Sequence, residues 1–219
     1  MLNTPESSTN SVAELVIGLM IAVARKIAWS DRVMRAGKWP KSEAMGVELC
    51  GKTLGVVGFG RIGRRVAEIA YAMGMKIIAH DVIPIPEEVL AKTNTKLTSL
   101  EELLRSSDVI TLHIPLTSET RHFINAEKIA MMKPTAILIN ASRGEVIDEE
   151  ALIQALTTRR IAGAGLDVYE KEPPTGSKLL ELDNIVLTPH IGAQTAEAQE
   201  AAATMLAKKI IEFFAPTQP

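Results

Sequence analysis

Three residues that could carry acid–base and carboxylate chemistry each follow an apolar run of the sequence. Arg143 lies in "NASRGEVID", Glu172 in "LDVYEKEPP" and His190 in "TPHIGA". An arginine can bind a carboxylate bidentately and polarise an adjacent carbonyl. A histidine can give or take a proton near neutral pH. A carboxylate beside the histidine would orient the ring and keep it protonated, as the reduction of a ketone requires.

Each of these residues also has a purely structural interpretation. Arg143 could form a salt bridge at a helix end, Glu172 could be a solvated loop acid, and His190 could pack beneath the last helix. Their spacing alone leaves both interpretations open. The other histidines (His80, His113 and His122) lack a comparable set of neighbours and are expected to be structural, and we expect no metal site.

A second chemical signal is the glycine-rich stretch "GFGRIG", which contains Gly58, Gly60 and Gly63 in G-x-G-x-x-G spacing. The stretch follows an expected strand and opens an expected helix. In a dinucleotide site, the first glycine permits the tight turn, the second lets the backbone approach a pyrophosphate, and the third lets helix and strand pack closely. The helix N-terminus would then face the phosphates. A plain tight turn is the alternative.

Asp81 ends the next apolar run, "KIIAHD", 18 residues after Gly63. This is close to the spacing of about 20 residues at which an acid accepts hydrogen bonds from the ribose of NAD. No Arg or Lys follows within "DVIPIPEE" to meet a 2′-phosphate, so the pattern favours NAD over NADP. A solvated aspartate at the strand end is the alternative.

The elements that must position these residues alternate along the chain. Strands are expected at 53–59, 76–81, 108–115, 136–142, 162–169 and 184–190, and helices at 61–75, 99–107 (capped by Ser99), 125–133, 148–159 and 195–214. Apolar strands that alternate with helices predict a Rossmann-type α/β fold, a doubly wound parallel sheet in three layers with long first and last helices. In such folds ligands bind outside the carboxyl ends of the strands, so the candidate residues should converge at one edge.

The first helix is expected to begin near Thr9–Ser11, with Ser11 and Glu14 as its cap, and to run to about Ala36 with Gly37 as its stop. Its apolar face is broader than one core-facing stripe requires. We therefore expect a homodimer formed through residues 11–36 and the loop 38–52. Cys50 and the loop around Trp39 are expected to pack against the domain.

Composition restricts the class of protein. The 219 residues suit one large domain, 47% of them are hydrophobic, and the net charge is −2. Neither this charge nor an aromatic content of 4% favours a nucleic acid or an anionic membrane as partner. No apolar run is long enough to span a membrane. A single cysteine and no signal-peptide pattern indicate a cytoplasmic protein.

Five motifs taken together resemble a known family. They are "GKTLGVVGFGRIGRRVA", "LHIPLTSET", "NASRGEVIDEEAL", "AGAGLDVYEKEPP" and "TPHIGAQTAEAQ". In this order, and over nearly the whole chain, they resemble the nucleotide-binding domain of the D-isomer-specific 2-hydroxyacid dehydrogenases. The resemblance implies hydride transfer between NAD and a small 2-hydroxy or 2-keto acid.

The resemblance also implies a role for each residue of the site. Arg143 would bind the substrate carboxylate and carbonyl, His190 would be the acid/base, and Glu172 would be its partner. The implied cofactor contacts are Gly58, Gly60, Arg61, Ile62 and Gly63 at the pyrophosphate, Asp81 at the ribose, Ile114 and Pro115 near the adenine-side ribose, Ala141, Ser142, Arg143 and Asp167 near the nicotinamide, and His190, Ile191, Gly192 and Ala193 closing that end.

The chain departs from the family pattern in one respect. In the family, the nucleotide domain is inserted within a second, substrate-binding domain, and that domain is expected to be absent from this chain. We therefore expect residues 1–219 to form one NAD-binding domain. A non-catalytic NAD-sensing interaction module on the same fold is the alternative function.

Overall fold

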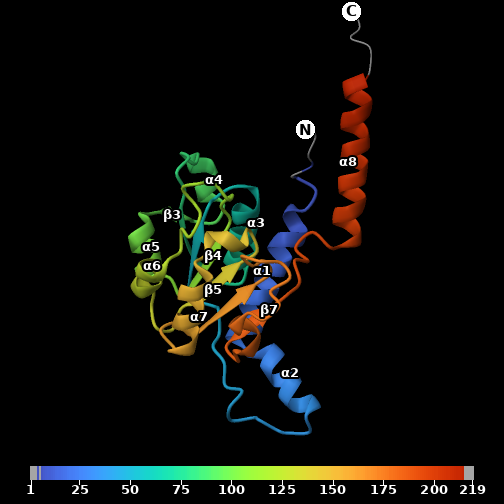
Figure 1. Ribbon diagram of the computed structural model, residues 1–219. Coiled ribbons are helices and arrows are strands. Elements are labelled where there is room, and N and C mark those ends of the chain that lie inside the picture. The colour runs from blue at the N-terminus through green and yellow to red at the C-terminus, as the bar shows by residue number, and fades with distance from the viewer. Residues whose placement is uncertain (1–3, 5, 215–219) are drawn as a thin grey trace, which may run out of the picture.

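The computed structural model describes residues 4 and 6–214 and contains a seven-stranded, entirely parallel sheet (Figure 1). The strand order is β3-β2-β1-β4-β5-β6-β7. The strands are β1 Thr53–Val57, β2 Lys76–His80, β3 Lys96–Leu97, β4 Val109–Leu112, β5 Ile137–Asn140, β6 Gly163–Leu166 and β7 Ile185–Leu187. The chain order reverses beside β1, as in a doubly wound Rossmann-type sheet, so the predicted fold class is confirmed.

Helices cover both faces of the sheet. The helices of the described residues are α1 Thr9–Ala24, α2 Ile27–Arg35, α3 Arg61–Ala72, α4 Glu87–Ala91, α5 Leu100–Ser106, α6 Ala126–Met131, α7 Glu149–Thr157 and α8 Ala196–Phe214, with short 3₁₀ turns at Gly144–Val146 and Lys178–Glu181. Helices α1 and α3 pack together on one face. Helices α5, α6 and α7 cover the other, so the domain has three layers.

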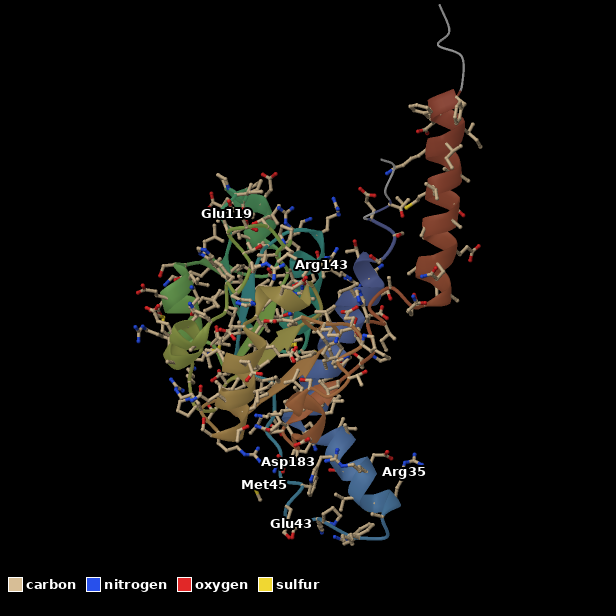
Figure 2. All side chains as sticks on the ribbon, viewed as in Figure 1. Arg35, Glu43, Met45, Glu119, Arg143 and Asp183 are labelled. Carbon is tan, nitrogen blue, oxygen red and sulfur yellow. The ribbon has the colours of Figure 1, made fainter. Side chains whose placement is uncertain are left out.

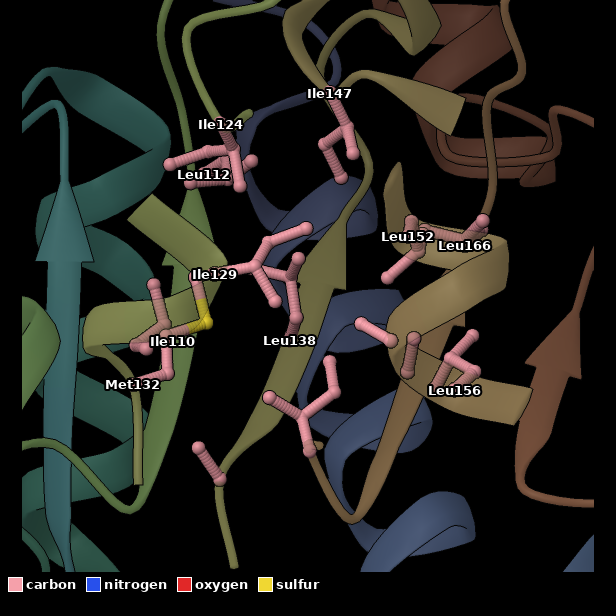
Figure 3. Packing of buried hydrophobic residues seen from close by; sticks show 14 of the residues in the cluster. Ile110, Leu112, Ile124, Ile129, Met132, Leu138, Ile147, Leu152, Leu156 and Leu166 are labelled. Atoms are coloured by element: carbon pink, nitrogen blue, oxygen red, sulfur yellow. The ribbon is translucent and has the colours of Figure 1, made fainter. Parts of the chain in front are cut away.

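The two faces of the sheet explain why the strands read as continuous apolar runs. Ile110 of β4 and Leu138 of β5 belong to the cluster under α5, α6 and α7 (Figure 3). Their neighbours Val109, Ile137 and Ile139 belong to the cluster under α1 and α3. Because side chains alternate between the faces of a strand, a strand covered on both sides must be apolar at each position.

The predicted single first helix is wrong, because the chain breaks after Ala24. Lys26 adopts a left-handed conformation with φ 54°, and the Ala24 carbonyl accepts a hydrogen bond from Val47 N at 2.9 Å. Helix α2 follows, and none of its residues is buried. The returning loop ends α1 by satisfying the carbonyl of Ala24, a contact between segments about twenty residues apart that helical periodicity does not contain.

The predicted cap of the first helix is also wrong. Ser8 occupies the N-cap position without a side-chain cap bond. The hydroxyl of Ser11 donates instead to the carbonyl of Gly192 at 2.6 Å. By contrast, Ser99 caps α5 as predicted, since its hydroxyl accepts from Glu102 N at 3.2 Å.

Two short elements at the sheet edge were not predicted. Strand β3 has two residues and pairs with Ile78 and Ala79 of β2, and α4 has five residues. Neither is long enough to show a hydrophobic period. The six predicted strands were drawn one to three residues too long at their carboxyl ends, where the chain leaves the sheet to form the rim.

The loop between α2 and β1 does not pack as expected. The side chain of Trp39 is 77% exposed, and Cys50 is exposed as well. At the other end of the chain α8 projects away from the sheet (Figure 1), and Ala198 is its buried residue. Among the described residues, no helix combines the length and apolar character needed to cross a bilayer.

Candidate functional site

The glycine loop joins β1 to α3 and leaves an open space above the helix. Gly58 has φ +90°, which a side chain would strain. A Cβ on Gly63 would lie 2.2 Å from the carbonyl oxygen of Gly58, so this position requires glycine for helix and strand to pack. A Cβ on Gly60 would meet nothing within 4 Å. The first and third glycines therefore shape the turn, and the second keeps space for a ligand.

The N-terminus of α3 is suited to bind an anion in that space. Gly60 is its N-cap residue and supplies no side-chain cap bond, so the N–H groups of the first turn remain available to a ligand. Backbone N–H groups and the helix dipole together stabilise a pyrophosphate. Ile62 is partly buried, and Arg61 is exposed with its guanidinium 3.8 Å from Glu6 Oε1. These residues fit the dinucleotide expected from the sequence.

Asp81 lies at the end of β2 and faces the glycine loop. Its Oδ2 accepts from Phe59 N at 2.6 Å, and its Oδ1 accepts from Ile83 N at 2.9 Å. Each carboxylate oxygen can accept a further hydrogen bond, so a ribose hydroxyl fits beside these amides. Across the turn, a Cβ on Gly58 would lie 2.9 Å from Ile114 Cγ2, and Pro115 is exposed beside it.

His190 and Glu172 form the expected pair. His190 Nδ1 lies 2.7 Å from Glu172 Oε2, and the two side chains are 51% and 39% exposed. Glu172 Oε1 accepts from Tyr169 N at 3.3 Å, so both carboxylate oxygens are engaged. With the carboxylate ionised, Nδ1 must be the donor, which leaves Nε2 to exchange a proton with a ligand.

Asp167 holds the segment that carries His190. Its side chain is 1% exposed. Oδ1 accepts from Thr188 Oγ1 at 2.7 Å and from Ile191 N at 2.8 Å, and Oδ2 accepts from Gly192 N at 2.8 Å. The buried carboxylate therefore orders the backbone on both sides of His190, a role that its sequence position after β6 did not reveal.

Arg143 lies on the loop after β5, at the carboxyl edge of the sheet (Figure 2). Its guanidinium is exposed and donates to Ser142 O at 2.6 Å. Buried Asn140 braces this loop: its Nδ2 donates to Arg143 O at 2.8 Å, and its Oδ1 accepts from Ser142 N at 3.0 Å. Ala141 is partly buried between them. Sequence reasoning missed Asn140, although an asparagine ending an apolar run is an available signal.

The loops that carry Arg143, Glu172 and His190 touch one another. A Cβ on Gly144 would lie 1.9 Å from the carbonyl carbon and oxygen of Tyr169. The phenol of Tyr169 donates to Thr188 O at 2.8 Å. Burial, with a smaller contribution from the charge of Asp167, raises the pKa of the Tyr169 phenol to about 12, so it remains a donor. Gly144 and Tyr169, neither of them predicted, therefore join the three loops.

Two of the remaining histidines have partners of their own. His113 Nε2 is 3.0 Å from Thr111 Oγ1, and burial lowers the pKa of the His113 imidazole to about 3. His122 Nε2 lies 2.9 Å from Glu170 Oε1. Within residues 4 and 6–214, no group of three or more His, Cys, Asp or Glu side chains is placed to hold a metal ion.

Fold and site together define a dinucleotide-binding domain, with a histidine–glutamate pair at the sheet edge that also carries the glycine loop. The family described as "D-isomer specific 2-hydroxyacid dehydrogenase, NAD binding domain" matches residues 17–192. The chain belongs to this family, and its cofactor is NAD.

Named relatives align with 96–98% of this chain. It is 49% identical over 211 residues to the D-3-phosphoglycerate dehydrogenase of Methanocaldococcus jannaschii. That alignment covers 96% of this chain and 40% of the dehydrogenase. It is 50% identical over 215 residues to the hydroxypyruvate reductase of Thermotoga maritima, covering 97% and 69%. The crystal structure of a glyoxylate reductase from Paecilomyes thermophila superposes with a TM-score of 0.92 at 38% identity, covering 98% and 65%. The chain thus spans between two fifths and about two thirds of these three proteins.

Proposed function

We propose that this chain is the NAD-binding half of an enzyme that transfers a hydride between NAD and a small D-2-hydroxy or 2-keto acid. The observation that carries the proposal is the 2.7 Å contact between His190 Nδ1 and Glu172 Oε2, at the sheet edge shared with the glycine loop. A histidine whose second nitrogen faces outward beside a dinucleotide site is suited to donate a proton to a carbonyl oxygen as it is reduced.

The residues of the chain divide the remaining work. The nicotinamide, when bound, supplies or accepts the hydride. Arg143 binds the substrate carboxylate bidentately and polarises the neighbouring carbonyl. His190 donates its Nε2 proton to the carbonyl oxygen in reduction and removes it in oxidation, and Glu172 stabilises the imidazolium. Asp167 holds the segment that carries the histidine in place and would lie beside a bound nicotinamide.

We assign D-3-phosphoglycerate as the substrate, oxidised to 3-phosphohydroxypyruvate in serine biosynthesis. The stretches "NTPESSTNSVAEL" and "IGAQTAEAQ" resemble those of D-3-phosphoglycerate dehydrogenases most, and such a relative is 49% identical. A glyoxylate or hydroxypyruvate reductase is the second candidate, because a hydroxypyruvate reductase is 50% identical. The single cysteine supports a reducing compartment such as the cytoplasm.

A substrate-binding domain outside this chain would complete the cleft. Helix α8 projects from the sheet with a row of exposed apolar side chains, which are Leu206, Ile210, Ile211, Phe213 and Phe214. A large exposed apolar surface of this kind marks an interaction site, and we assign it to that domain. Without the opposite wall the substrate is not fixed against the nicotinamide, and positioning of this kind is worth about 7–11 kcal/mol. The chain alone should therefore bind NADH but turn over substrate several orders of magnitude more slowly than the complete enzyme.

We also propose the homodimer that was expected through residues 11–36 and the loop 38–52; within these ranges, α2 and the loop offer the exposed surface. Helix α2 buries none of its residues, and Met34, Trp39 and Met45 are exposed. A cavity of about 450 Å³, lined in part by Trp29 and Met45, opens beside them at the end of the sheet opposite Arg143 (Figure 2). Light scattering at micromolar concentration should give the mass of a dimer, and a monomer mass would contradict the proposal.

An assay of the protein that includes the substrate-binding domain tests the proposed reaction. NADH oxidation is followed with phosphohydroxypyruvate, glyoxylate and hydroxypyruvate in parallel, and the first should give the highest kcat/KM. His190→Ala should lower kcat about 10²–10⁴-fold, the usual contribution of a positioned proton donor. His122→Ala is the matched control, because His122 also pairs with a glutamate, at 2.9 Å, and should leave kcat unchanged.

Two outcomes of this assay would reject the proposal. A His190→Ala enzyme with the kcat of the unmodified protein would make the histidine structural. NADH binding without turnover of any of the three acids would favour the second class of function, a non-catalytic NAD-sensing module whose output is association with a partner.

A further inference from the structure

The hydroxyl of Ser11 connects the start of α1 to the loop that carries His190. Ser11 Oγ donates to the carbonyl oxygen of Gly192 at 2.6 Å, across 181 residues of sequence. The side chain is partly buried. Since Ser11 does not cap α1, this contact is the interaction that the structure gives its hydroxyl.

Residues 190–193, here called the histidine loop, are held from the opposite side by Asp167. The amides of Ile191 and Gly192 each donate to that carboxylate at 2.8 Å. A Cβ on Gly192 would lie 3.2 Å from both Asp167 Oδ2 and Val12 Cγ2. The loop is therefore clamped between a buried carboxylate and the first turn of α1.

The conformation of His190 makes this clamp important. His190 has φ +55°, in the left-handed region that a non-glycine residue rarely adopts. Such a conformation persists only where surrounding contacts impose it. The direction of the imidazole, and with it the 2.7 Å contact with Glu172, depends on the contacts that hold residues 191 and 192.

We propose that Ser11 is a positioning residue for the His190–Glu172 pair. It holds Gly192 against Asp167 and so keeps His190 in the left-handed conformation that directs Nδ1 at Glu172. The effect of Ser11 on catalysis rests on the proposed function, in which a displaced His190 would no longer present Nε2 to the substrate.

The test follows the side-chain nitrogens of His190 by NMR in this chain, with and without NADH, and needs no turnover. In the unmodified protein the neutral imidazole should be a single tautomer protonated at Nδ1, because Glu172 accepts that proton. In Ser11→Ala the two tautomers should exchange. Loss of one hydrogen bond should also speed amide exchange at Ile191 and Gly192 about fivefold.

Two further variants and a control separate positioning from general stability. Ser11→Thr keeps the hydroxyl and should restore the single tautomer. Ser11→Cys keeps the size but is a weak donor, so it should resemble Ser11→Ala. Ser7→Ala is the matched control, since it removes a hydroxyl-to-carbonyl bond of 2.8 Å to Thr4 in the same segment and should change nothing at His190.

A His190 spectrum in Ser11→Ala identical to that of the unmodified protein would overturn the inference. The same holds if Ser7→Ala disturbs His190 equally, or if Ser11→Thr fails to restore the tautomer. Because these signals are read without substrate, they stand or fall separately from the dehydrogenase assay, in which only turnover is measured.

Discussion

Replacing Gly144 by alanine should separate the two loops that carry Arg143 and Glu172. A Cβ at this position would lie 1.9 Å from the carbonyl carbon and oxygen of Tyr169 and 2.6 Å from Glu170 N. Ordinary van der Waals contact begins at 3.4 Å, so the loops must move apart by about 1.5 Å. The atoms in the way belong to the backbone, so no side-chain rotation can relieve the clash.

The size of the effect follows from that displacement. Overpacking in a buried contact costs about 1–3 kcal/mol, and a backbone clash belongs at the upper end. For a domain of this size, 3 kcal/mol lowers Tm by roughly 6–12 °C. A misplacement of about 1 Å between catalytic groups can cost about 10²-fold in kcat. The glycine loop at Gly58–Gly63 is not touched, so NADH affinity should fall far less than kcat.

Thermal unfolding by circular dichroism and titration with NADH measure these effects on the chain itself, and kcat is measured in the protein with its substrate-binding domain. Gly18→Ala is the control, because its Cβ would meet nothing within 4 Å in the exposed face of α1. That change should stabilise the helix by up to about 1 kcal/mol. A Gly144→Ala protein whose Tm lies within about 1 °C of that of the unmodified protein would refute the reasoning.

Three other changes have effects of predictable direction. Gly60→Val should leave Tm nearly unchanged, since a Cβ there meets nothing within 4 Å, yet calorimetric titration should show NADH binding abolished because the side chain fills the pyrophosphate space; normal affinity would contradict this. Asp81→Ala should weaken NADH binding by about 1–3 kcal/mol and also lower Tm, because the Phe59 amide loses its acceptor, whereas unchanged affinity would remove Asp81 from the site. His113 has a folded pKa of about 3, well below its unfolded value of 6.5, so between these pH values the unfolded chain binds the extra proton. The free energy of unfolding should therefore rise with pH across this window with a slope approaching about 1.4 kcal/mol per unit, and His113→Gln should flatten it in urea titrations; an unaltered slope would count against a buried neutral ring.

The sequence alone determined those parts of the protein that depend on local pattern. The alternation of apolar runs with amphipathic segments predicted the layered parallel sheet, because a strand covered on both faces must be apolar throughout. The spacing of Gly58, Gly60 and Gly63 predicted the loop, because a tight turn and a close helix–strand contact are decided within six residues. Parallel strands end at one edge, which was enough to expect His190 and Glu172 together.

Tertiary structure decided what depends on contacts between distant segments. The break at Lys26 arises where the loop at Val47 returns to the Ala24 carbonyl. The partner of Ser11 lies 181 residues away, so a serine that looks like a helix cap instead holds the histidine loop. The requirement for glycine at position 144 comes from the backbone of Tyr169 on another loop. Hydrophobic period and turn chemistry describe a residue's near neighbours, whereas these roles are set by which loops the folded sheet brings into contact.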